Sequence, residues 1–154
     1  MILAALLITI VDAGFLSVPA VQRFAPELFL IAAIWSGLRA DETGGVRFAV
    51  LTGLGAGCFT AGPICLPAFF AVLAATLAST LQLLFGKTRE ARLLLTAVTL
   101  LLIVLARIAW QSFGRSHNVV AWSVAGTMTK FFVSLFVSPV VFALLDKTRF
   151  RTRI

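Results

Sequence analysis

The stretch GLGAGCFTAGPICLP, residues 53 to 67, has glycines at spacings that also occur in nucleotide-binding loops. Gly57 and Gly62 match the two glycines of a phosphate-binding P-loop, in which the next residue is a lysine that contacts phosphate. Pro63 occupies that place here, and no three of these glycines fit the G-x-G-x-x-G fingerprint of dinucleotide-binding proteins. The glycines therefore give no reason to expect a bound nucleotide.

The same stretch contains the only two cysteines, Cys58 and Cys65. Their spacing is not that of a zinc-binding pair, and the single histidine, His117, is distant in sequence. Since a free cysteine commonly packs as a small apolar side chain, we predict that both are buried and that neither binds a metal. A disulfide at an outward-facing turn is the alternative.

Three charged residues, Asp12, Arg107 and Lys130, lie inside apolar segments. A charge near the centre of a bilayer costs at least about 2.5 to 3.5 kcal/mol, so it usually faces protein or water and finds a partner. We therefore predict that Asp12 pairs with Arg107 or with Lys130. The alternative is that Arg107 extends outward to the lipid headgroups. A proton relay would need more titratable groups than these.

No catalytic site is predicted. The sequence has no H-E-x-x-H or G-x-S-x-G motif, and no apolar segment holds two carboxylates at helical spacing. Hydroxyl groups inside apolar segments, such as those of Ser134 and Ser138, usually bond the backbone or a neighbouring helix. We expect a protein that is not an enzyme and that binds no cofactor.

The composition indicates a membrane protein. Of the 154 residues, 60% are hydrophobic and only 12% are charged, whereas about a quarter of a typical soluble domain is charged. Residues 48 to 86 contain no Asp, Glu, Lys or Arg. As one helix they would extend roughly 58 Å, about twice the hydrocarbon core, so they must cross twice or re-enter. Helix-breaking Gly62 and Pro63 mark the turn.

Polar loops divide the rest of the chain in the same way, so the sequence predicts one all-α domain, residues 1–154, folded as a six-helix transmembrane bundle. The first segment lacks a basic start and contains Asp12, which favours a membrane helix over a cleaved signal peptide. Gly53 and Gly57 form a small-residue face for close helix packing, and Pro139 is expected to kink the last helix. The predicted helices are 1–21, 24–38, 46–61, 66–85, 93–110 and 120–145.

The positions of the basic residues predict the orientation. Nine of the thirteen Lys and Arg residues fall on the side of the membrane that holds both termini, and only Arg23 and Arg115 fall on the other. Because cytoplasmic loops are enriched in Lys and Arg, we predict that both termini are cytoplasmic. We attribute the net charge of +7 to this topology and to attraction for anionic lipids, not to nucleic-acid binding. The nine are Arg39, Arg47, Lys87, Arg89, Arg92, Lys147, Arg149, Arg151 and Arg153.

The segment APELFLIAAIWSGLRADETGGVRFAVLTGLGAGCFTAGPICLPAFFAVLAA resembles the core of MreD, the bacterial rod shape-determining membrane protein family. That family shows a short apolar helix after a proline, a basic loop, a glycine-rich helix and a Gly/Pro turn. The ending SPVVFALLDKTRFR, which contains Pro139, is similar to the family's last helix and tail. Family members commonly carry an Asp where this chain has Cys58. The matching positions are Pro26, Leu28, Arg39, Gly53, Gly57, Gly62 and Pro63.

The resemblance covers nearly the whole chain and implies a function. MreD proteins are non-enzymatic parts of the rod-elongation complex in the bacterial cytoplasmic membrane. They bind MreC, a single-span protein, beside the wall polymerase and transpeptidase and the MreB filaments. The resemblance thus implies a scaffold whose helix-packing and partner-binding candidates are Gly53, Gly57, Gly62, Pro63 and Pro139.

The six-helix bundle is also similar in architecture to the substrate-binding components of energy-coupling-factor vitamin transporters. That similarity provides the alternative function, a small-molecule binding component of a membrane transporter. Such a component needs a pocket with several convergent polar groups. The outer side offers few polar residues for this purpose: Gln22, Arg23, Glu27, Arg115, His117 and Asn118. We therefore favour the scaffold.

Overall fold

The computed structural model describes residues 2–17, 26–39, 42–59, 63, 65–85, 88–112 and 117–151, and these ranges are helical apart from short connecting residues. They contain no strand, as the sequence predicts. Within them, the helices in chain order are α1 (Ile2–Ser17), α3 (Leu28–Arg39), α4 (Glu42–Cys58), α5 (Cys65–Phe85), α6 (Arg89–Ser112) and α7 (His117–Arg151).

Three helical segments are long and apolar enough to cross a membrane: Cys65–Phe85, Glu90–Trp110 and Val124–Lys147. Their length and composition identify the chain as a membrane protein. By contrast, α3 has 12 residues and extends only roughly 18 Å, well short of the roughly 30 Å hydrocarbon core. The predicted span 24–38 is therefore represented, in the described residues, by a helix too short to cross alone.

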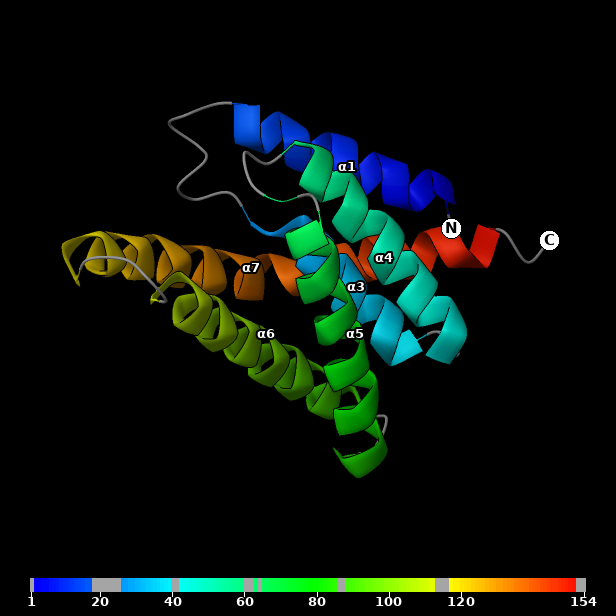
Figure 1. Cartoon of the computed structure of the whole chain (residues 1–154). Helices are drawn as coiled ribbons and strands as arrows, with labels where there is room; N and C mark the ends of the chain where they lie inside the picture. The colour runs from blue at the N-terminus through cyan, green and yellow to red at the C-terminus, as the bar shows by residue number, and fades with distance from the viewer. Residues whose placement is uncertain are drawn as a thin grey trace.

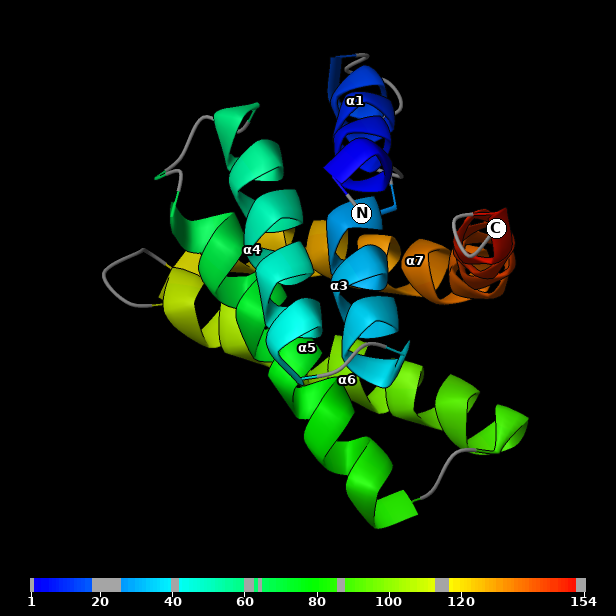
Figure 2. The same cartoon turned by 90° about the vertical axis from the view of Figure 1, so that its right-hand side faces the viewer.

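Helix α3 lies at the centre of the bundle (Figure 2). Every residue from Leu28 to Leu38 is buried, and α3 contacts each of the other five described helices. Its sequence explains this position, because LFLIAAIWSGL is apolar around its whole circumference and has no face suited to water. The other helices surround it and present large apolar side chains outward.

Small residues allow the helices around α3 to approach closely. A Cβ atom added to Gly37 would lie 2.9 Å from the carbonyl carbon of Ala75, so α3 and α5 are nearly in backbone contact there. In the same way, a Cβ on Gly53 would lie 2.9 Å from the backbone nitrogen of Ala68, on α5. Gly57 is buried one turn further along α4. These contacts leave no room for larger residues.

The other candidate packing residues have different positions. Gly62 lies outside the described residues. Pro63 is exposed between α4 and α5, at the place where the sequence predicts the turn. Pro139 is exposed on α7, which continues as a helix on both sides of it.

Successive helices run in alternating directions (Figure 1). The start of α1, the end of α3, the start of α4, the end of α5, the start of α6 and the end of α7 therefore lie toward one side of the bundle. Arg39, Arg47, Arg92 and Lys147 belong to helix ends on that side. The alternation places these four basic residues toward the same side of the bundle.

Candidate functional site

Charged side chains from distant parts of the chain meet at the start of α3. Arg107 of α6 forms an ion pair with Glu27, which directly precedes α3. Asp12 of α1 is buried, and its carboxylate lies near the start of α3. Asp12 also interacts electrostatically with Glu27, Arg107 and, on α7, Lys130. We refer to Asp12, Glu27, Arg107 and Lys130 as the charge cluster.

The charge cluster suits the end of α3 at which it lies. The first N–H groups of a helix have no partner within the helix, and its N-terminus carries a partial positive charge. The carboxylates of Asp12 and Glu27 both lie at this end. The backbone N–H of Glu27 donates a hydrogen bond to Oγ of the buried Ser134 on α7, at 3.0 Å. The hydroxyl of Ser134 and the Arg107–Glu27 ion pair thus fix the start of the central helix against α7 and α6.

Arg107 connects three helices at this point. Its guanidinium pairs with Glu27 and also lies over the ring of Phe70 on α5, 5.3 Å from the ring centroid. The planar guanidinium can make both contacts at once, and the attraction to an aromatic face increases when water is excluded. The side chains of Arg107 and Glu27 are only 22% and 15% exposed. The pair therefore fixes α6 and α5 against the start of α3.

The ion pair at this site differs from the one that the sequence predicts, in which Asp12 pairs with Arg107 or with Lys130. The ion partner of Arg107 is Glu27, whereas Asp12 meets Arg107 and Lys130 only at longer range. In the sequence, Glu27 is only one of the few polar residues on the predicted outer side. Glu27 directly precedes a helix that is apolar on every face. This position could have indicated that its carboxylate has a buried partner.

A second polar contact holds the other end of α3. The indole Nε1–H of Trp35 donates to Oδ1 of Asp146 at 2.9 Å, and Nη2 of Arg39 donates to Oδ2 at 2.6 Å. Asp146 belongs to α7, so both ends of α3 are bonded to the same helix. The Arg39–Asp146 pair is more exposed than the pair in the charge cluster, with side chains 38% and 32% accessible.

The prediction that both cysteines are buried is wrong. Cys58 and Cys65 are free thiols and both are exposed. The reason is their position, because α4 ends at Cys58 and α5 begins at Cys65, so both lie at helix ends rather than within a packed interface. Among the described residues, no group of three His, Cys, Asp or Glu side chains is placed to hold a metal ion.

Comparisons of the chain with protein-family models, with curated proteins and with solved structures found no match. Function therefore has to be inferred from the chain's own residues. In the charge cluster, the ion pair between Arg107 and Glu27 connects α6 to the start of α3, and Asp12 and Lys130 interact with these groups at longer range. Chemically, this arrangement is suited to holding a buried helix in place.

Proposed function

We propose that this protein is a non-enzymatic membrane scaffold of the bacterial rod-elongation complex, of the MreD type. It lies in the cytoplasmic membrane as a six-span bundle with both termini in the cytoplasm. It binds an MreC-type single-span protein and, directly or through that protein, the wall polymerase and transpeptidase and the MreB filaments. The residues shared with the MreD pattern, such as Gly53 and Pro139, support the proposal.

The observation that carries the proposal is the division of side chains between the inside and the outside of the bundle. The ion pair between Arg107 and Glu27 lies inside, where it holds α3, and large apolar side chains cover the outside. Phe136 is 81% exposed and Leu83 is 79% exposed, and similar residues continue along α5, α6 and α7. A protein built in this way offers partners a helix surface rather than a reactive pocket.

Such a surface imposes conditions on the partner. An apolar helix gains little by leaving lipid, because acyl chains are as apolar as leucine, so close packing and interhelical hydrogen bonds must provide the affinity. A single-span partner satisfies these conditions with the least loss of lipid contact. The basic residues at one side of the bundle would, in addition, hold anionic lipids.

The alternative, a vitamin-binding transporter component, would use the charge cluster as its ligand site. The ion pair between Arg107 and Glu27 argues against this, because a ligand would have to replace that partially buried contact. Asp12 is likewise engaged with the start of α3. A scaffold would leave these contacts of Arg107, Glu27 and Asp12 in place.

Affinity purification in mild detergent tests the proposal. We expect the tagged wild-type chain to recover an MreC-type protein in near-equal amount, and a comparably tagged, unrelated six-span protein to recover none. Recovery of a transporter energising module, or of a bound vitamin, in place of the MreC-type protein would contradict the scaffold.

A further inference from the structure

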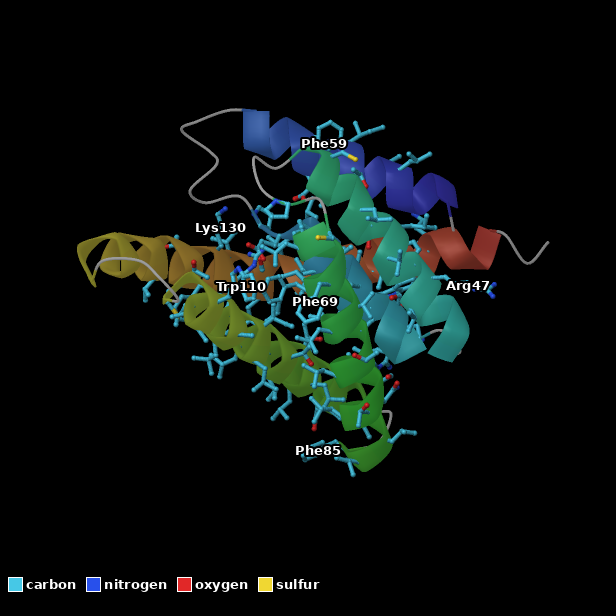
Figure 3. All side chains as sticks on the ribbon, in the orientation of Figure 1. Arg47, Phe59, Phe69, Phe85, Trp110 and Lys130 are labelled. Atoms are coloured by element: carbon cyan, nitrogen blue, oxygen red, sulfur yellow. The ribbon has the colours of Figure 1, made fainter. Side chains whose placement is uncertain are left out.

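Lys130 is a cation at the edge of the bundle within an apolar segment. It belongs to the candidate span Val124–Lys147 and is partly exposed. It projects from α7 on the side away from α6 (Figure 3). One edge of α7 therefore presents a partly exposed ammonium group within an apolar span, where a charge is costly unless it has a partner.

The carboxylates of the charge cluster do not pair with this ammonium group. Glu27 pairs with Arg107, and the only other ion pair within 4.0 Å in the described part of the chain is Arg39–Asp146. Asp12 is buried and interacts with Lys130 only from beyond that distance. An ammonium group has three hydrogen-bond donors, so Lys130 retains the capacity to bind a further carboxylate.

The backbone beside Lys130 is accessible. Gly126 lies one helical turn before it, on the same side of α7. A Cβ atom added to Gly126 would meet nothing within 4 Å, in contrast to Gly37 and Gly53, where it would meet another helix. A small residue with open space beside it allows a second helix to approach the backbone closely.

We propose that the edge of α7 formed by Gly126 and Lys130 docks a transmembrane helix that carries an Asp or Glu at the depth of Lys130. Gly126 admits the partner's backbone, and the ammonium group binds its carboxylate. The inference rests on the proposed function, because it names the chemistry by which the scaffold recognises a single-span partner. It identifies the partner by a feature that is rare in apolar helices, an acidic side chain within the span.

Charge complementarity selects this occupant over a second copy of the chain. The carboxylates near this depth, Asp12 and Glu27, are buried or paired within the bundle, so another copy could not offer them to Lys130 without unfolding its own core. A lipid phosphate is the other anionic group that could reach the site. The experiment therefore has to separate a peptide carboxylate from a lipid headgroup.

The test uses the full-length protein in phosphatidylcholine vesicles, with fluorescently labelled polyleucine transmembrane peptides measured by energy transfer. One peptide carries a single Glu at the depth of Lys130, and the other carries Leu. We expect the Glu peptide to bind about tenfold more tightly. Lys130→Met should abolish this preference, and Lys130→Arg should preserve most of it.

Two glycine variants supply the matched control. Gly126→Leu should block the Glu peptide without changing the thermal melting of the protein, since a Cβ added there meets nothing within 4 Å. Gly14→Leu also adds a side chain where a Cβ would meet nothing within 4 Å, but on α1, and should leave peptide binding intact.

Equal binding of both peptides to wild type, or a preference that survives Lys130→Met, would overturn the inference. In parallel vesicles that also contain phosphatidylglycerol, enrichment of this lipid around the wild type, dependent on Lys130 and without peptide preference, would assign the ammonium group to a headgroup instead. The vesicles contain no wall-synthesis protein, so failure here is distinguishable from failure of the proposed function in the affinity purification.

Discussion

Replacement of Glu27 by Leu is expected to lower the free energy of unfolding by about 3 kcal/mol, because it leaves Arg107 without its ion partner inside the bundle. The guanidinium is mostly buried and cannot move to water without leaving Phe70 and the start of α3. Unfolding in mixed micelles, titrated with a denaturing detergent and followed by circular dichroism, measures the loss.

Two comparisons show whether the loss comes from the ion pair. The double variant Glu27→Leu with Arg107→Leu removes both charges and should recover most of the stability, since an apolar replacement of a buried pair is often tolerated. Arg39→Leu breaks the more exposed pair with Asp146 and should cost about 1 kcal/mol or less. If Glu27→Leu costs no more than Arg39→Leu, the charge cluster does not hold α3 as described.

The second large effect is expected at the contact between α4 and α5. Gly53→Leu should destabilise the protein by about 3 kcal/mol or prevent folding, because a Cβ there already overlaps the backbone of Ala68. A backbone cannot change rotamer to make room, so the two helices must separate. Thermal melting in detergent measures the change.

Gly126→Leu is the matched control for this prediction. It makes the same substitution on a helix of the same bundle, but with nothing within 4 Å of the new Cβ, so its melting temperature should stay at the wild-type value. Equal melting of the Gly53 and Gly126 variants would show that α4 and α5 do not pack as closely as described.

The sequence predicts the helices well where apolar runs are long and uninterrupted. The segment expected at 66–85 is α5, at Cys65–Phe85. The segment expected at 93–110 is part of α6, which begins earlier, at Arg89, because a helix is not confined to its apolar residues. Thr88 supports this earlier start, since its hydroxyl accepts a hydrogen bond from the N–H of Ala91 at 3.2 Å.

The charge cluster could be predicted only in part. Asp12, Arg107 and Lys130 are recognisable as charges within apolar segments, but the partner of Arg107 is 80 residues away in sequence, at Glu27. That pairing depends on how four helices pack around α3, which local patterns do not encode. The exposure of Cys58 could not be predicted for a similar reason. The general preference of cysteine for burial does not show whether a particular cysteine lies at a helix end.

We propose that this protein supports cell shape rather than transport, and depletion in a rod-shaped bacterial host tests this most directly. Cells depleted of the protein should become round while their vitamin uptake stays normal, and the wild-type chain supplied in trans should restore the rods. Depleted cells that remain rod-shaped but fail to import a vitamin would contradict the scaffold and favour the transporter component.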